Sequence, residues 1–159
     1  MTVAFVGLGS NLGDREEHLR RAIEALKAIP DLDSVVLSSI LETDPLGGPA
    51  QGDYLNAVVR CETSLTPQDL LQELLQIEQQ LGRTREVVNG PRTIDLDLLM
   101  YGQVHLQETD LQLPHPRLQD RRFVIEPLAE LEPNLMLACG VTAAERLSQL
   151  LDHEHEASA

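Results

Sequence analysis

The sequence has few cysteines, few aromatic residues and no long apolar run. Its two cysteines, Cys61 and Cys139, lie far apart, which argues against a disulfide framework. Cys61 falls in an alternating strand pattern and is expected to be a core residue, with a catalytic thiol as the alternative. No apolar stretch approaches the ~20 residues of a membrane-spanning helix. The N-terminus also lacks the features of a signal peptide. We therefore expect a cytoplasmic protein without membrane contact.

Positive charge is also scarce. Twelve Lys and Arg residues stand against 26 Asp and Glu, giving a net charge of −14, which argues against nucleic acid as a ligand. All the basic residues except Lys27 are arginines, and half of the basic residues lie in one quarter of the chain: Arg83, Arg85, Arg92, Arg117, Arg121 and Arg122. Because Arg forms forked contacts with phosphate, this cluster favours a small polyphosphate ligand. Surface salt bridges are the alternative interpretation.

The stretch from Gly90 to Gly102 contains two aspartates in an otherwise strongly apolar run. Read as a strand, it places Asp95 and Asp97 on one face, with apolar residues on the other. Two carboxylates held so close repel each other unless a cation neutralises them. Mg²⁺ suits such a pair, because it takes oxygen ligands and leaves room for phosphate oxygens. An ordinary solvated strand face is the alternative, although the apolar neighbours argue against it.

Strand and helix signals alternate along the chain, which at 159 residues is long enough for one domain, 1–159. Strands are predicted over 2–8, 34–43, 54–59 and the aspartate stretch. Helices are predicted after Asp14, which forms a capping box with Glu17, and after Thr66, with Pro67 in the first turn and Gly82 at the end. This order is typical of a ferredoxin-like α/β sandwich, an antiparallel-rich sheet flanked by helices.

The C-terminal third is expected to add further helices to that sandwich. The pattern predicts a short strand over 111–113, a short helix over 123–131 interrupted by Pro127, and a last helix over 142–151. Residues 152–159 are expected to form a disordered acidic tail. The Pro/Gly-rich segment 44–53 and the polar segment 83–89 are predicted loops, and the second could close over a phosphate substrate.

Three other side chains stand out by position. Tyr54 and Asn56 share a strand face, where stacking and amide hydrogen bonds would suit a flat heterocycle. A core tyrosine beside an edge asparagine is the alternative. Glu78 lies at the edge of an apolar helix stripe, as a partner for Arg83 or Arg85 or as a site residue.

Two sequence features are interpreted as structural. The glycines at 7, 9 and 13 have the wrong spacing for a dinucleotide fingerprint, and no P-loop lysine follows them. That turn is therefore interpreted as structural, with Asn11 near the site. His115 lies between two prolines, a setting in which histidine is more often structural than catalytic.

Four motifs in register resemble one family. The motif Gly-Pro-Arg-Thr-Ile-Asp-Leu-Asp-Leu-Leu at 90–99, the glycine-rich 7–13 segment, Asp-Tyr-Leu-Asn-Ala at 53–57 and Pro114-His115 are similar to those of the 6-hydroxymethyl-7,8-dihydropterin pyrophosphokinases of folate biosynthesis. The resemblance covers residues 2–150. It implies transfer of diphosphate from ATP to the pterin hydroxymethyl group by a monomeric enzyme.

The same resemblance implies roles for particular residues. Asp95 and Asp97 would bind two Mg²⁺ ions, and Arg83 and Arg92 would contact the transferred phosphates. The implied ATP contacts are Glu78, Arg85, Leu98, His115 and Arg121. The implied pterin pocket consists of Thr43, Leu46, Tyr54, Asn56 and Phe123. Val88, Asn89 and Pro116 depart from the basic or aromatic residues of some members, which concerns loop closure and ATP contacts rather than the reaction.

Two other functional classes fit the residues themselves. One is a two-carboxylate nucleotidyl enzyme of the polymerase-palm kind, against which the acidic surface argues. The other is a non-catalytic ligand-binding module with a structural metal site.

Overall fold

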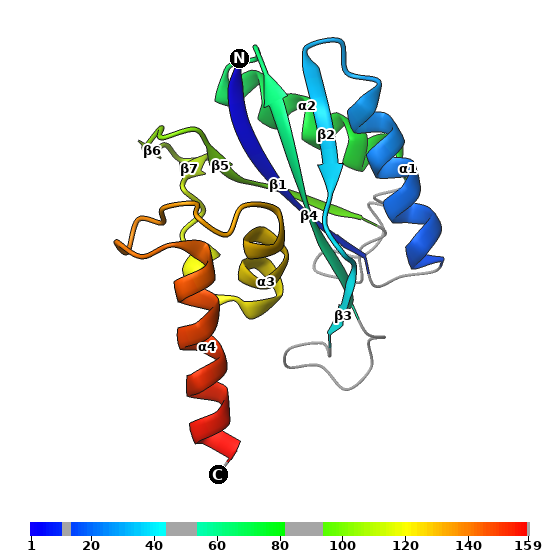
Figure 1. Cartoon of the computed structure of the whole chain (residues 1–159). Coiled ribbons are helices and arrows are strands. Elements are labelled where there is room, and N and C mark those ends of the chain that lie inside the picture. Colours follow the sequence, from blue (N-terminus) through cyan, green and yellow to red (C-terminus); the bar gives the residue numbers. More distant parts are fainter. Residues whose placement is uncertain (11–13, 44–53, 82–93, 159) are drawn as a thin grey trace.

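One antiparallel sheet forms the centre of the molecule. A computed structural model describes residues 1–10, 14–43, 54–81 and 94–158, with the side chains of 43 and 153–158 left out. The strands are β1 (Thr2–Ser10), β2 (Leu32–Leu37), β3 (Leu41–Thr43), β4 (Tyr54–Thr63) and β5 (Asp95–Tyr101). Their order is β2-β4-β1-β5, with β3 also paired to β4 (Figure 1). The interleaving of β1 between β4 and β5 is the ferredoxin-like arrangement that the sequence predicts.

Helices cover both faces of this sheet (Figure 1). The first pair, α1 (Arg15–Lys27) and α2 (Pro67–Gln80), covers one face, and α3 (Arg122–Leu131) with α4 (Ala143–Ser158) lies on the other. The predicted caps are present: Asp14 accepts a hydrogen bond from the Glu17 N–H at 3.2 Å, and Thr66 accepts one from the Asp69 N–H at 3.1 Å. A short hairpin, β6 (Leu106–Gln107) and β7 (Gln112–Leu113), and a 3₁₀ turn, η1 (Leu118–Asp120), connect β5 to α3.

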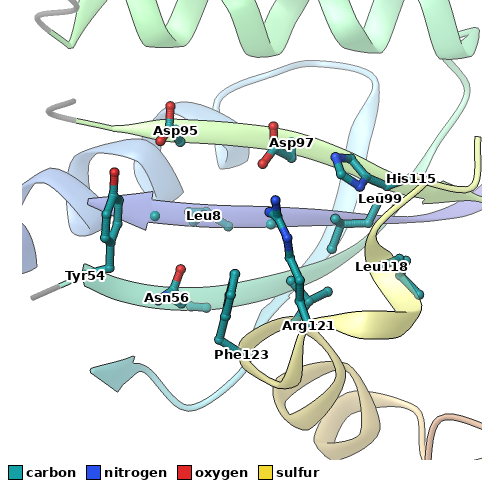
Figure 2. A pocket seen from close by; sticks show the side chains of 14 residues that line it. Leu8, Tyr54, Asn56, Asp95, Asp97, Leu99, His115, Leu118, Arg121 and Phe123 are labelled. Atoms are coloured by element: carbon teal, nitrogen blue, oxygen red, sulfur yellow. The ribbon is translucent and has the colours of Figure 1, made fainter. Parts of the chain in front are cut away.

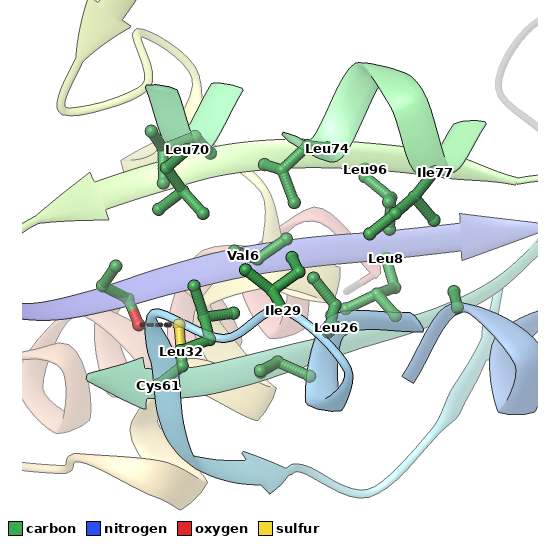
Figure 3. Packing of buried hydrophobic residues seen from close by; sticks show 14 of the residues in the cluster. Val6, Leu8, Leu26, Ile29, Leu32, Cys61, Leu70, Leu74, Ile77 and Leu96 are labelled. Atoms are coloured by element: carbon green, nitrogen blue, oxygen red, sulfur yellow. Dashed lines mark hydrogen bonds between the residues drawn. The ribbon is translucent and has the colours of Figure 1, made fainter. Parts of the chain in front are cut away.

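The two faces of the three central strands differ in chemistry. On the face toward α3, β5 presents Asp95 and Asp97, β4 presents Tyr54 and Asn56, and β1 between them has only glycine at the matching positions (Figure 2). On the face toward α1 and α2, the alternate residues are apolar and pack with helix side chains into the main core (Figure 3). Each fully buried leucine of this core contributes about 1.5–3 kcal/mol to folding.

A register shift in β5 marks the end of the polar residues on the face of the sheet toward α3. Phe5 pairs with Met100 and Val6 with Leu98, so Leu99 is an extra residue in β5. Leu99 and Met100 therefore both join the second core, with α3 and α4. Before the bulge, β5 presents carboxylates on the face toward α3, and after it the strand presents buried apolar side chains on that face.

Two predicted elements differ from the structure in their continuity. The strand predicted over 34–43 is two strands, because Ser38 interrupts it: its N–H donates to the Val58 carbonyl and its hydroxyl accepts the Val58 N–H, both at 2.9 Å. Pro127 does not interrupt α3, which runs unbroken through it. A proline inside a helix costs about 3 kcal/mol, and burial of Val124, Ile125 and Leu128 offsets that cost.

The C-terminal helix is longer than the sequence pattern indicates. It continues to Ser158 and so includes most of the segment expected to be a disordered tail. Its start is fixed by Thr142 and Glu145, which accept hydrogen bonds from each other's backbone N–H at 3.2 and 3.3 Å. This reciprocal cap, followed by good helix formers, favours one continuous helix. Within the described residues, no helix has the length and apolar character to cross a bilayer.

Candidate active site

A cavity of about 290 Å³ lies on the face of the sheet toward α3. Seven of the residues singled out in the sequence line it: Tyr54, Asn56, Asp95, Asp97, His115, Arg121 and Phe123 (Figure 2). They come from β4, from β5 and from the segment that leads into α3. Residues about 40 positions apart in the sequence, such as Asn56 and Asp97, therefore meet at one surface, because β4 and β5 are both neighbours of β1.

Glycines of β1 form the floor of this cavity. Gly9 pairs with Asn56 on one side and Asp95 on the other, and Gly7 pairs with Asp97. A Cβ at Gly9 would lie 3.5 Å from the Asn56 side-chain oxygen, in ordinary contact distance but inside the cavity. The absence of side chains at these two positions leaves open space between the carboxylates and the Tyr54 and Asn56 side chains.

The two aspartates project from β5 on the same side (Figure 2). Asp97 is exposed and Asp95 is half-buried. Among the described residues, no group of three or more His, Cys, Asp or Glu side chains could hold a metal ion. Two carboxylates beside a cavity nevertheless match the donor set of Mg²⁺, which keeps waters and phosphate oxygens as its remaining ligands.

His115 lies next to Asp97 with a defined orientation (Figure 2). Its backbone N–H donates to the Leu99 carbonyl at 2.8 Å, and its Nδ1 accepts the Arg117 N–H at 3.2 Å. An accepting Nδ1 assigns the proton of the neutral ring to Nε2. Burial lowers the pKa of His115, and the positive charges of Arg121 and Arg117 lower it further, while Asp97 acts in the opposite direction. The ring is therefore a neutral hydrogen-bond donor at neutral pH.

Arg121 and Phe123 form the wall opposite the sheet. The Arg121 guanidinium lies 5.5 Å from the centroid of the Phe123 ring, within the range of a cation–π contact. Arg121 reaches from the start of α3 toward the β5 carboxylates (Figure 2). A cation and an aromatic ring thus line the cavity side by side. The guanidinium suits a phosphate group, and the phenyl ring suits a flat ring.

A second hollow of about 270 Å³ adjoins the first. Asp97 and His115 line both hollows. Half of the residues that line the second hollow are apolar: Leu71, Leu96, Leu98, Leu111 and Pro116. The other half are polar or charged: Asp97, Thr109, Asp110, Gln112 and His115. One ligand could therefore extend from the first hollow to the second across Asp97.

Glu78 lies on the core side of β5 and does not line the first cavity. Its side chain is only 4% exposed, and its carboxylate accepts the Leu96 N–H at 2.9 Å. Leu98 is also buried, and it borders the second hollow. Of these two predicted ATP contacts, Leu98 thus lies at the second hollow, whereas Glu78 lines neither hollow.

Several predicted site residues lie outside the described part of the structure. These are Leu46, Arg83, Arg85, Arg92 and the side chain of Thr43, whose backbone pairs with Tyr54 in β3. Asn11, Gly82, Val88 and Asn89 also lie outside it. Conversely, the sequence did not single out Gly7 and Gly9 as cavity residues. The signal was present, since glycines alternate with Val6 and Leu8 in an apolar strand.

Comparison with known proteins identifies the family. Residues 5–133 match the family model described as 7,8-dihydro-6-hydroxymethylpterin-pyrophosphokinase, HPPK. The chain is 47% identical over 129 residues to the 2-amino-4-hydroxy-6-hydroxymethyldihydropteridine pyrophosphokinase of Bacillus subtilis, covering 81% of this chain and 77% of that protein. It is 44% identical over 150 residues to the protein of the same name from Methylorubrum extorquens, covering 94% of each.

A solved structure shares the fold. The wild-type HPPK-DHPS of Plasmodium falciparum with SDX-DHP superposes with a TM-score of 0.72 at 14% identity, covering 98% of this chain. The chain spans 45% of the length of that protein, and the likeness concerns the fold alone. On the family model and the two bacterial relatives together, the chain belongs to the 7,8-dihydro-6-hydroxymethylpterin-pyrophosphokinase family.

Proposed function

We propose that this chain, as one monomeric domain, transfers the terminal diphosphate of ATP to 6-hydroxymethyl-7,8-dihydropterin with the help of two Mg²⁺ ions. The protein is a pyrophosphokinase of folate biosynthesis. The observation that carries the more detailed proposal is the pair of hollows that share Asp97 and His115. This border lies where a triphosphate would have to bridge a nucleoside and a pterin.

The first hollow fits the pterin. Phe123 and Tyr54 offer aromatic surfaces, and the Asn56 amide offers a donor and an acceptor for the ring edge. The glycine floor leaves a flat space between them. Thr43 and Leu46 complete this pocket in our proposal, on the basis of the motif resemblance.

The second hollow fits the nucleoside of ATP. The apolar side chains among its lining residues, including Leu71, Leu98 and Pro116, suit a purine ring, and Asp97 borders it. From there the phosphates would pass between Asp95 and Asp97 on one side and Arg121 on the other. Neutral His115 would donate from Nε2 to a phosphate oxygen. We assign Glu78 and Arg85 to the nucleotide end, and Arg83 and Arg92 to the transferred phosphates.

The chemistry needs no covalent intermediate with the protein. The pterin hydroxymethyl oxygen attacks the β-phosphorus of ATP and loses its proton, and the bond from that phosphorus to the α–β bridging oxygen breaks, so AMP leaves with this oxygen. Bound at Asp95 and Asp97, Mg²⁺ would neutralise phosphate charge and hold the phosphates in line. The arginines and His115 orient the same oxygens and stabilise the charge of the transition state.

A labelled-ATP assay tests this function against the other classes. With γ-labelled ATP, label should appear in the pterin product, and α-labelled ATP should give labelled AMP only when hydroxymethyldihydropterin is present. Release of free pyrophosphate, with the AMP portion joined to an acceptor, would indicate a nucleotidyl transferase instead. Binding of ATP without turnover would indicate a binding module.

The site also bears on where the protein works. Both cysteines are free thiols. Free thiols and ATP as the substrate support a cytoplasmic location.

A further inference from the structure

The C-terminal helix α4 contacts the segment that carries two cavity residues. The family-model match ends at residue 133, so α4 lies beyond it. His115 and Arg121 flank the short turn η1, and Leu118 in that turn also lines the cavity. Arg146, in the first turn of α4, reaches this segment.

The Arg146 guanidinium makes three hydrogen bonds. Its Nε donates to the Gln119 backbone carbonyl at 2.8 Å, and one terminal nitrogen donates to Asp120 at 3.3 Å. The other terminal nitrogen donates to the Gln149 side chain at 3.1 Å, one turn further along α4. The Arg146 side chain is 25% exposed. The planar guanidinium of Arg146 thus donates hydrogen bonds from α4 to both the backbone and a side chain of η1.

Apart from Arg146, the turn is held by the burial of Leu118 in the second core and by the hydrogen bond from the His115 N–H to the Leu99 carbonyl. Neither η1 nor the start of α3 has a side-chain cap. Within η1, the Leu118 N–H donates to the His115 carbonyl at 3.1 Å and the Asp120 N–H to the Arg117 carbonyl at 3.2 Å. Such a short 3₁₀ turn has poor intrinsic stability, so an outside contact has a large influence on its geometry.

We propose that Arg146 is a positioning residue of this active site. By holding Gln119 and Asp120, it fixes η1 so that His115 and Arg121 face the phosphate-binding border of the two hollows. Arg146 lines neither hollow itself, and it acts through Arg121 and His115. This inference rests on the proposed function.

A double-mutant cycle tests the proposal. Arg146→Ala should lower kcat/KM for ATP about tenfold, while the folded fraction at the assay temperature stays unchanged. In an Arg121→Ala background, the same substitution should lower kcat/KM by a clearly smaller factor, because only the part of the effect that acts through His115 remains. Arg146→Lys, which keeps one donor for the Gln119 carbonyl, should recover part of the rate. Ser148→Ala, at an exposed position of the same helix, is the matched control and should leave kcat/KM near that of the unaltered chain.

The possible outcomes separate the positioning role from a general structural one. Equal fold-losses for Arg146→Ala with and without Arg121 would overturn the positioning role, as would an equal loss for Ser148→Ala. Should Arg146→Ala not fold, the same cycle with Arg146→Gln and with Asp120→Ala decides the question by the same criterion. If the unaltered chain forms no AMP with the pterin, the proposed function fails, and the positioning role falls with it.

Discussion

The backbone N–H of Leu96 donates a hydrogen bond of 2.9 Å to the buried carboxylate of Glu78, and Leu96 is the residue between Asp95 and Asp97. Among the described strands, β5 pairs only with β1 in the main sheet, so α2 supplies this acceptor at its other edge. The strand that carries both carboxylates is therefore held from two sides. Glu78 therefore supports the site through the strand.

Two substitutions of Glu78 separate the contribution of its hydrogen-bond acceptor from that of its negative charge. Glu78→Ala leaves a buried N–H without this acceptor, which should cost about 1–3 kcal/mol, or roughly 2–4 °C in Tm for each kcal/mol. Glu78→Gln keeps an oxygen in place and should lose less. Thermal unfolding without ligands measures both. Equal losses of Tm in the two variants would show that the hydrogen bond to Leu96 is not what the carboxylate contributes.

The carboxylate pair should matter for turnover and not for folding. Asp97→Asn should lower kcat by at least about a hundredfold, because a ligand for the metal is weakened. Its Tm without metal should stay equal or rise, since a charge repulsion between Asp95 and Asp97 is removed. Mg²⁺ with a non-hydrolysable ATP analogue should raise the Tm of the unaltered chain much more than that of the variant. A near-normal rate in Asp97→Asn would contradict the assignment of this pair to the metal.

Local patterns predicted which side chains share a face, and they could not predict which faces meet. The two-residue period of a strand places Asp95 with Asp97 and Tyr54 with Asn56, as the structure has them. The meeting of the two pairs depends on β1 lying between β4 and β5, which is a long-range property of the sheet. Motif resemblance supplied that link, since periodicity carries no information on strand order.

The differences from the predicted elements also have local physical causes. Ser38 divides the predicted strand because its hydroxyl takes the place of a partner carbonyl, which no propensity scale detects. Pro127 remains inside α3 because tertiary burial outweighs its local cost. Arg146 shows no sequence pattern at all, since its partners Gln119 and Asp120 are more than 25 residues away.

The glycine floor can be tested by filling it. Gly9→Ala adds a methyl group in ordinary contact with the Asn56 oxygen and near Tyr54, so folding should be little changed. The methyl group would occupy the space proposed for the pterin. We expect KM for the pterin to rise about tenfold or more, equivalent to about 1.4 kcal/mol, with KM for ATP changed much less. A higher KM for ATP alone would place the pterin elsewhere.

Gly102 is the control for Gly9, because its replacement should lower the Tm and leave the KM for the pterin unchanged. It has a φ of +52°, and a Cβ there would lie 2.8 Å from Thr2 Cγ2, so Gly102→Ala should be strained and should lower Tm. It does not line either of the two site hollows. At a temperature where the variant is folded, KM for the pterin should match that of the unaltered chain. An unchanged Tm would contradict the strained backbone at this glycine.

The two thiols should react very differently with an alkylating reagent. Cys61 is fully buried in the main core, and its Sγ donates to the Ala4 carbonyl at 3.7 Å (Figure 3). Burial raises the pKa of Cys61 to about 11, with the charge of Arg60 acting in the opposite direction, so the reactive thiolate is scarce at pH 8. Cys139 is exposed. At pH 8 the native protein should take up one equivalent of iodoacetamide, at Cys139, and the second only after unfolding, as mass spectrometry of the digested protein would show.

Cys61→Ala should remove the second equivalent and leave kcat near that of the unaltered chain, because no step of the transfer uses a thiol. Rapid labelling of Cys61 in the native state would mean that the sheet opens between β1 and β4, and a large loss of kcat in Cys61→Ala with Tm unchanged would reassign this thiol to the chemistry.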